Sequence, residues 1–389
     1  MVKKERGNRL LRSLDWYVGI PLLFILSTLK RKKIKDGNNR NIKRVLVIKL
    51  GAIGDTVLLM PVLKTIKESF PGMVLSVVGS NDNIEVLNRV DWIDDIILFD
   101  ISRTVKDPLY LLDFIRKLSQ YKFQLTMDFE PWSRISALLA TLIRSEYKVG
   151  FRSRWQYRHY NFDIAVPHQK NLHERDNYEK YIEQIGLQGN NHKFIFPINE
   201  LEEKKSEEIL QEFQISHRLF VVFHPWNAGY KKWYKEWNTE NYIKLAERLI
   251  SREYSIVVTG SPQDSVRVKP IIEKYPGKIF SVCGRLNLGE SIALIKKSLL
   301  LVTANTGIMH IVATFDHPMI AIHGPVSVQR WGPLETTNCY NFDVHCYCSS
   351  LYNHGFEFKC RNKRCIDEIS PDQVAETVFR MLENGNPKT

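Results

Sequence analysis

Continuous apolar runs alternate with amphipathic stretches along most of the chain. In the first half, runs of strand length occupy 44–50, 74–78, 96–99 and 124–128, and helical spacing of apolar residues occurs at 56–69, 109–118 and 134–143. Because strands that are apolar throughout are buried on both faces, this alternation predicts a parallel sheet covered by helices.

The same pattern restarts in the second half. Predicted strands lie at 219–223, 255–259, 299–302 and 319–322, and predicted helices at 239–251, 291–298 and 309–315. We therefore expect an α/β protein with two Rossmann-like, doubly wound domains. The expected order is an N-terminal segment (1–40), a first domain (41–195), a linking helix (196–217) and a second domain (218–389). Ligands bind at the carboxyl ends of such strands, so a cleft between the domains is the expected site.

Residues 1–40 combine basic and apolar positions. Five cations lie in the first 12 residues, an apolar run extends from Trp16 to Leu29, and four more cations occupy 30–33. The apolar run is shorter than the ~20 residues of a spanning helix, and no small-residue cleavage site of a signal peptide follows it. We expect residues 10–35 to lie on an anionic membrane surface. A helix packed on the protein itself and a spanning helix stay open as alternatives.

The charge balance narrows the choice of partners. The 389 residues include 55 Lys and Arg against 43 Asp and Glu, a net charge of +12. The composition is otherwise that of a globular protein, which excludes a disordered tail, a fibre and a polytopic membrane protein. The excess favours membrane lipid, a phosphorylated substrate or nucleic acid as partner. No nucleic-acid-binding module is recognisable, so nucleic acid is not expected.

A loop with two glycines follows the first predicted strand, at 49–56. Gly51 and Gly54 permit close approach of the backbone to a ligand, and the helix that follows offers a positive N-terminus. Asp55 is placed to act as a general base at the edge of the sheet. The simpler alternative is that Asp55 only caps the helix.

Two loops of the second half also follow predicted strands. The loop at 224–233 contains Asn227 and Lys231, and a lysine there can neutralise a diphosphate; the alternative is a solvated lysine. The loop at 303–310 places Thr306 and Gly307 at a helix N-terminus, where phosphate oxygens are stabilised. His310 either contacts the ligand or lies in the core.

A basic loop in the first half interleaves cations with aromatic residues. Arg152, Arg154 and Arg158 alternate with Trp155 and Tyr157. We expect this basic surface, which comprises Arg144, Lys148, Arg152, Arg154, Arg158 and His159, to face an anionic acceptor, with Arg152 and Arg154 binding it. The alternative is a loop that is simply solvated.

Five of the six cysteines fall late in the chain, between positions 339 and 365. Cys346, Cys348, Cys360 and Cys365 could hold a structural metal, although their spacing is irregular. Free thiols and disulfides are the alternatives, and disulfides conflict with a cytosolic location.

Taken together, these motifs resemble one family, the bacterial heptosyltransferases of glycosyltransferase family nine. The similar segments are 44–61, 223–233, 258–264 and 301–334, with further similarity at Asp128, 133–135, 149–151 and His173. The resemblance extends over about 42–380 and is specific because several motifs occur in the same order and spacing.

The resemblance implies a GT-B fold and an inverting, metal-independent transfer of heptose from ADP-heptose, with no cofactor required. The implied acceptor is the lipopolysaccharide inner core, on the inner face of the cytoplasmic membrane. Asp55 matches the family's base and Lys231 matches a lysine that contacts the diphosphate. The other residues expected to bind substrate are Gly54, Thr56, Asn227, Asn305, Thr306, Gly307, His310 and, as a looser match, Asp264.

Two departures from the family pattern concern the donor. Asn305 stands where the family usually has Asp, and Tyr234 where it usually has Pro. An amide carries no charge and can both accept and donate, so it can contact a donor sugar in a different way from a carboxylate. A related transferase with another nucleotide sugar is therefore one alternative. A non-catalytic protein that binds a sugar nucleotide or a glycolipid is another.

Overall fold

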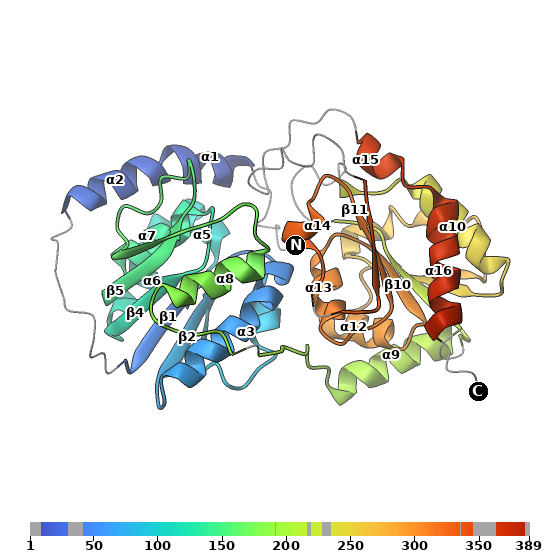
Figure 1. The fold of residues 1–389 in the computed structure, drawn as a ribbon, viewed down its shortest axis with the longest axis horizontal. Helices are drawn as coiled ribbons and strands as arrows, with labels where there is room; N and C mark the ends of the chain where they lie inside the picture. Colours follow the sequence, from blue (N-terminus) through green and yellow to red (C-terminus); the bar gives the residue numbers. More distant parts are fainter. Residues whose placement is uncertain are drawn as a thin grey trace. The chain divides into compact units, whose positions relative to one another are not determined.

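The computed structural model describes residues 9–29, 42–190, 192–215, 219–227, 235–334, 336–344 and 363–385. The chain divides into two compact units, Met1–Phe194 and Ile195–Thr389 (Figure 1). Within the described ranges each unit contains one six-stranded sheet, and every pairing in both sheets is parallel. The predicted class of two doubly wound α/β domains is confirmed.

The first unit has the strand order β3-β2-β1-β4-β5-β6. The strands are β1 (Arg44–Ile48), β2 (Val74–Gly79), β3 (Asp95–Leu98), β4 (Phe123–Asp128), β5 (Ser145–Arg152) and β6 (Ile164–Pro167). The helices are α1 (Arg9–Tyr17), α2 (Gly19–Leu29), α3 (Ile53–Ser69), α4 (Ile84–Leu87), α5 (Ile101–Lys106), α6 (Pro108–Ser119), α7 (Arg134–Leu142) and α8 (Glu174–Glu183). The strand order reverses between β1 and β4, so the edge formed by their carboxyl ends is where this fold binds ligands.

The second unit has the strand order β12-β11-β10-β7-β8-β9. The strands are β7 (Phe220–His224), β8 (Ser255–Val258), β9 (Ile279–Ser281), β10 (Leu300–Ala304), β11 (Met319–His323) and β12 (Cys339–Asp343). The helices are α9 (Glu200–Glu212), α10 (Thr239–Ile250), the 3-10 helix η2 (Pro262–Ser265), α11 (Lys269–Ile272), α12 (Leu288–Lys296), α13 (Gly307–Ala313), α14 (Val328–Trp331), α15 (Arg364–Asp367) and α16 (Pro371–Gly385). Here the order reverses between β7 and β10. These two strands pair in parallel, with Thr303 of β10 opposite His224 of β7.

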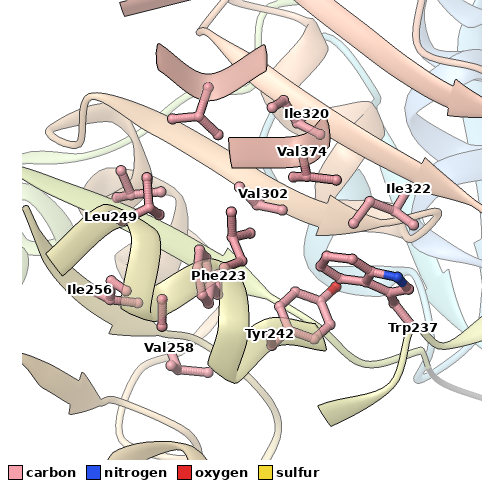
Figure 2. Packing of buried hydrophobic residues seen from close by; sticks show 14 of the residues in the cluster. Phe223, Trp237, Tyr242, Leu249, Ile256, Val258, Val302, Ile320, Ile322 and Val374 are labelled. Atoms are coloured by element: carbon pink, nitrogen blue, oxygen red, sulfur yellow. The ribbon is translucent and has the colours of Figure 1, made fainter. Parts of the chain in front are cut away.

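The core of the second unit explains why its strands are apolar throughout. Figure 2 shows Phe223, Val302 and Ile320 of the sheet beside side chains from the covering helices. Trp237 and Tyr242 meet edge to face with ring centroids 5.0 Å apart, and the Trp237 indole donates to the Ile369 carbonyl at 3.0 Å. These contacts close the core on the side covered by α10 and α16.

Helix α9 lies where the sequence predicts a linking helix. It packs on α12 of the second unit, and Lys297 pairs with Glu207 at 2.8 Å. The N-terminal segment is helical as α1 and α2. Together they form one helical stretch, Leu10–Leu29, that is long and apolar enough to cross a membrane by length and composition, with a mean hydropathy of 1.4.

Candidate functional site

The loop between β1 and α3 holds Asp55 in the first turn of α3. Ala52 opens the turn at φ 30°, a conformation that costs a non-glycine residue energy and that often marks a functional site. Both backbone N–H groups of Leu50 and Gly51 donate to Glu130 Oε1, at 2.9 and 2.6 Å. The loop is therefore held by a side chain from the segment after β4.

Lys49 connects this carboxylate to Asp55. Its ammonium lies 3.3 Å from Glu130 Oε1 and 4.0 Å from Asp55 Oδ2, and its side chain is 1% exposed. Burial acts to lower the pKa of Lys49, but the carboxylates of Glu130, Asp55 and Glu174 outweigh it and raise the pKa. Lys49 is therefore a permanent cation beside Asp55, which stabilises the ionised carboxylate that a base requires.

The Asp55 side chain is the most accessible member of this group, with 21% of its surface exposed. An ionised carboxylate at the edge of a sheet and open to solvent can accept a proton from a substrate hydroxyl. Ala52 occupies the N-cap position of α3, so Asp55 is not the N-cap residue, and the loop before the helix is fixed by Glu130.

Gly54 and Thr56 are buried at the start of α3, directly after this loop. Thr56 Oγ1 donates to the Ala52 carbonyl at 2.9 Å and accepts from Asn83 Nδ2 at 2.9 Å. Asn83 Nδ2 also donates to the Lys49 carbonyl at 2.8 Å. The hydroxyl of Thr56 thus fixes the loop, while its predicted contact with substrate stays a prediction.

A buried ion pair lies beside the loop, at the end of β4. Arg158 binds Asp128, and both side chains are fully buried. Burial raises the pKa of Asp128 to about 6, against the opposing effect of Arg158. Arg158 also donates to the Ser133 and Phe151 carbonyls, at 2.9 and 3.0 Å. The prediction that Arg158 faces an acceptor is therefore wrong: it is a core residue that holds three segments together.

Arg152 and Arg154 are exposed, as the predicted acceptor contacts must be. Trp155 follows Arg154 in the sequence and precedes the buried Gln156. The Arg154 guanidinium stands 5.4 Å from the Trp155 ring centroid. The structure leaves both arginines available to an anionic ligand.

In the second unit, Asn305 follows β10 and is part of a hydrogen-bonded row. Its Nδ2 donates to the Trp331 carbonyl at 3.1 Å and to His323 Nδ1 at 2.9 Å. A carbonyl can only accept, so the orientation of the amide is fixed. His323 Nδ1 must then accept, and its Nε2–H donates to Asn341 Oδ1 at 2.8 Å.

The row therefore holds His323 neutral. Burial lowers the pKa of His323 to about 4, in agreement with that assignment. Because both amide hydrogens of Asn305 are used within the protein, the part of Asn305 left for a ligand is its carbonyl oxygen, an uncharged acceptor.

Three predicted donor contacts belong to α13: two at its start and His310 in its last turn. Thr306 is the N-cap residue and Gly307 the first residue of the helix. The hydroxyl oxygens of Thr303 and Thr306 lie 3.5 Å apart, and the Thr303 hydroxyl donates to the His224 carbonyl at 3.4 Å. This places the β7 and β10 ends together, as the switch point requires. His310 is buried in α13.

Asn227 and Asp264 belong to one charged cluster. The Asn227 N–H donates to Glu236 Oε1 at 3.1 Å, and Arg267 joins Glu236 at 2.7 Å and Asp264 at 3.3 Å. Asp264 also accepts from the Ser261 N–H at 2.9 Å. Glu236 and Arg267 thus link Asn227 to Asp264. The Asn227 side chain donates to the Lys235 carbonyl at 3.0 Å and the Asp264 side chain accepts from Ser261, so each helps to hold its own loop.

Lys231, Tyr234, Cys346, Cys348 and Cys360 lie outside the described residues. Cys365 is buried. Over the ranges that the structure describes, no group of three or more His, Cys, Asp or Glu side chains could hold a metal ion.

The comparisons with known proteins decide the family. Residues 111–360, well over half of the chain, match the model described as glycosyltransferase family 9 (heptosyltransferase). The chain belongs to glycosyltransferase family 9. It is therefore a glycosyltransferase, and the family predicted from the sequence motifs is confirmed.

Two curated relatives are also named as heptosyltransferases. The chain is 36% identical to lipooligosaccharide heptosyltransferase 2 of Haemophilus influenzae over 26% of its length, a match that spans 30% of that relative. It is 23% identical to lipopolysaccharide heptosyltransferase 3 of Escherichia coli over 86% of its length and 96% of the relative.

Solved structures support the fold of this family-9 chain. The family 9 glycosyl transferase of Veillonella parvula superposes with a TM-score of 0.76 at 22% identity, covering 90% of this chain and all of that one. E. coli heptosyltransferase WaaC with ADP-2-deoxy-2-fluoro heptose superposes with a TM-score of 0.64 at 17% identity, covering 87% of this chain and 99% of that one. The GT-B arrangement of these proteins is thus confirmed as the fold class.

Sequence reasoning missed two residues of the Asp55 site, Lys49 and Glu130. Lys49 is the charged residue that interrupts the apolar run 45–50, which is a usable signal. Glu130 carries no such signal, because its role depends on β1 and β4 being neighbours in the sheet.

Proposed function

We propose that this family-9 transferase moves heptose from ADP-heptose to the inner core of a lipopolysaccharide, with inversion at the anomeric carbon. The observation that carries the proposal is Asp55, an accessible carboxylate beside the buried Lys49 cation at the β1–β4 switch point. The relatives named as lipopolysaccharide heptosyltransferases and the structure named with an ADP-heptose analogue support the choice of substrates.

Asp55 acts as the base in a single displacement. The acceptor hydroxyl gives its proton to the carboxylate, and the acceptor oxygen forms a bond to the anomeric carbon. The bond from that carbon to the diphosphate oxygen breaks on the opposite face, and ADP leaves with the electron pair. Attack opposite to the leaving group inverts the anomeric configuration.

The second unit supplies the donor contacts in this scheme. Thr306 and Gly307 begin α13, where backbone N–H groups stabilise negative charge on the diphosphate. Lys231 neutralises the same group, as the family resemblance implies. The Asn305 carbonyl oxygen accepts from a donor sugar hydroxyl. In this scheme the base comes from the first unit and the donor contacts come from the second.

The acceptor is an anionic glycolipid held by Arg152 and Arg154 in this proposal. Guanidinium groups bind phosphate with paired hydrogen bonds, and phosphorylated core sugars carry such groups. Residues 10–35 rest on the membrane surface that contains the acceptor, on the inner face of the cytoplasmic membrane. The basic residues on both sides of the apolar run favour an anionic surface.

A donor panel tests the proposal against its alternatives. The full chain is incubated with a core acceptor and ADP-heptose, and in parallel with other nucleotide sugars, and nucleotide release is measured. We expect release with ADP-heptose above all. Preferred release with another nucleotide sugar would identify a transferase with a different donor. No release with any donor, together with donor binding, would favour the non-catalytic binding protein.

A further inference from the structure

The helices α1 and α2 expose a continuous apolar stripe. Most of the exposed large apolar side chains are three or four residues apart, at Leu10, Leu14, Tyr17, Val18, Leu22, Phe24, Ile25 and Leu29. That spacing places them on one side of a helical stretch about 30 Å long. Apolar stripes of this size on a water-soluble unit mark a contact with a partner or a membrane.

The opposite side of the same helices is fixed to the first unit. Asp15 Oδ1 accepts from the backbone N–H groups of Arg134 and Ile135, at 2.8 Å each, and so caps α7. The Arg134 guanidinium returns to Asp15 Oδ2 at 3.1 Å and stands 4.2 Å from the Trp16 ring centroid. Further along, Leu23 is completely buried in the core of the unit.

The basic and aromatic loop after β5 runs beside these helices. Gln156 accepts from Arg134 with its side chain at 2.6 Å and with its carbonyl at 3.2 Å. At the other end of the loop, Asn161 donates to the Leu23 carbonyl at 2.9 Å. Trp155 and Tyr157, on either side of Gln156, are exposed. One arginine, Arg134, therefore joins the helices to the loop that carries Arg152 and Arg154.

The charges around α1 and α2 favour an anionic bilayer as the partner of the exposed apolar stripe. Between residues 9 and 29 the sequence has one acidic residue, Asp15, and the structure uses it in the bond to Arg134. Nine cations flank or enter the stretch at 3–12 and 30–33. Exposed aromatic rings beside cations are typical of the headgroup region.

The attachment also sets the orientation. A helix that crosses the bilayer is surrounded by lipid, whereas this one buries Leu23 and pairs Asp15 with a residue of the folded unit. A crossing helix would have to give up both contacts and leave Asp15 unpaired in hydrocarbon, which is costly.

We propose that α1 and α2 lie in the plane of the membrane while docked on the first unit, with the stripe in the lipid, so that Arg152 and Arg154 meet the anionic headgroups of the acceptor in the bilayer. This inference rests on the proposed function for the identity of the acceptor. The Asp15–Arg134 bond makes the segment a positioning device as well as an anchor.

Vesicle binding tests the stripe. The full chain is sedimented with vesicles of phosphatidylglycerol and phosphatidylethanolamine, and with phosphatidylcholine alone. The double variant Leu22→Glu/Ile25→Glu is expected to lose at least tenfold in binding to the anionic vesicles. The control Leu201→Glu/Leu219→Glu changes two exposed leucines of the second unit and should bind within twofold of the unmodified chain. Equal binding by the stripe variant, or equal binding to both vesicle types, would overturn the proposal.

An alkaline carbonate wash separates lying from crossing. The docked helices should be released from the vesicles, and retention after the wash would show a spanning segment instead. Asp15→Ala tests the docking itself: it should bind vesicles within twofold, yet transfer heptose severalfold more slowly to an acceptor embedded in vesicles. Asp113→Ala, which removes an exposed acid of the same unit, is the control. Unchanged transfer by Asp15→Ala would overturn the positioning role.

A water-soluble, delipidated core acceptor keeps this inference distinct from the proposed function. The stripe variant should use that acceptor within twofold of the unmodified chain. If the unmodified chain itself fails with every acceptor and donor, the proposed function is wrong, while the vesicle results still decide the membrane contact.

Discussion

The Asp55 loop and the Asn305 loop each lie at the switch point of a six-stranded parallel sheet, after β1 in the first unit and after β10, the counterpart of β4, in the second, and they are stabilised by opposite means. Each follows a central strand at the point where the strand order reverses. Asp55 is held among charges, with Lys49 and Glu130 buried beside it. Asn305 is held among neutral groups, through His323 and Asn341.

The difference follows from the work proposed for each loop. A base must be ionised, and a buried cation next to it keeps it so. A contact with a neutral sugar hydroxyl needs only an acceptor of fixed orientation, which an amide in a closed row of hydrogen bonds provides. The departure from Asp at position 305 is thus matched by a histidine that the surroundings keep uncharged.

Asp55→Ala is the change with the largest expected effect. Loss of a general base costs about 10²–10⁴ in rate. We expect turnover to fall into that range or below detection, with donor binding within severalfold of the unmodified chain, measured by calorimetry with ADP-heptose. Substantial residual turnover would reject Asp55 as the base.

Lys231→Ala provides the contrast from the second unit. It should weaken donor binding as well as turnover, because a diphosphate contact is made in both the bound and the reacting state. Unaltered donor binding would remove Lys231 from the donor site.

Lys49→Met tests whether the charged loop depends on its buried cation. Removing one partner of a buried ion pair costs about 3–5 kcal/mol, because the remaining carboxylates are left uncompensated. The measurement is the free energy of unfolding in urea, followed by hydrogen exchange of β1. The control Lys64→Met breaks an exposed pair with Glu68 and should cost under about 0.5 kcal/mol.

Glu130→Gln keeps an oxygen for Leu50 and Gly51 while removing the charge. It should retain the fold and lower turnover more than donor binding.

Equal stability of the Lys49→Met and Lys64→Met variants would show that the charges of the loop do not stabilise it.

Sequence reasoning found Asp55 and the loop at 303–310, because glycines and polar residues directly after apolar strands mark sheet edges, and the resemblance to the family drew attention to Asn305 in that loop. It could not find Glu130 or the Asn305–His323–Asn341 row, because these depend on which strands become neighbours. Arg158 shows the limit of sequence reasoning most clearly. Its position in a basic loop predicts an exposed residue, yet its side chain is fully buried, where it pairs with Asp128 and donates to two backbone carbonyls. The strands β5, β6, β9 and β12 were missed because they are short or carry polar residues at their ends.

Asn305→Asp tests the neutral row. A carboxylate would face the lone pair of His323 Nδ1 and the Trp331 carbonyl, so two hydrogen bonds would be lost, at about 1–3 kcal/mol for each buried group left unsatisfied. The new charge should raise the pKa of His323, so stability should recover as the pH falls and His323 gains a proton. NMR titration of His323 measures the shift.

The control for this change is Asn287→Asp, at the N-cap of α12, where Asp caps as well as Asn. Asn305→Asp with unchanged stability and an unchanged His323 titration would contradict the assigned row of hydrogen bonds.

Acidification should have a smaller effect, of opposite sign in the two units: it should destabilise the surroundings of His323 in the second unit and stabilise those of Asp128 in the first. The pKa of His323 is about 4 in the folded chain against 6.5 unfolded, so the unfolded state binds the proton first and stability is lost as the pH falls from 7 to 5, by about 2 kcal/mol. His317, with a pKa of about 4, acts in the same direction. Asp128 has a folded pKa of about 6 against 3.8 unfolded, so its protonation in the folded state stabilises the first unit over the same range, by about 1 kcal/mol.

Hydrogen exchange at pH 7 and pH 5, corrected for the intrinsic rates, measures this divergence. Protection in β10 and β11 should decrease relative to protection in β4. A parallel change in both regions would show that charge does not distinguish them.

The most direct test of the central claim is the acceptor product itself. The full chain and Asp55→Ala are incubated side by side with ADP-heptose and a phosphorylated core acceptor, and the product is examined by mass spectrometry and NMR. The account predicts an acceptor that has gained one heptose with inverted anomeric configuration, formed by the unmodified chain and not by Asp55→Ala. A product of retained configuration, or the same yield from both proteins, would contradict it.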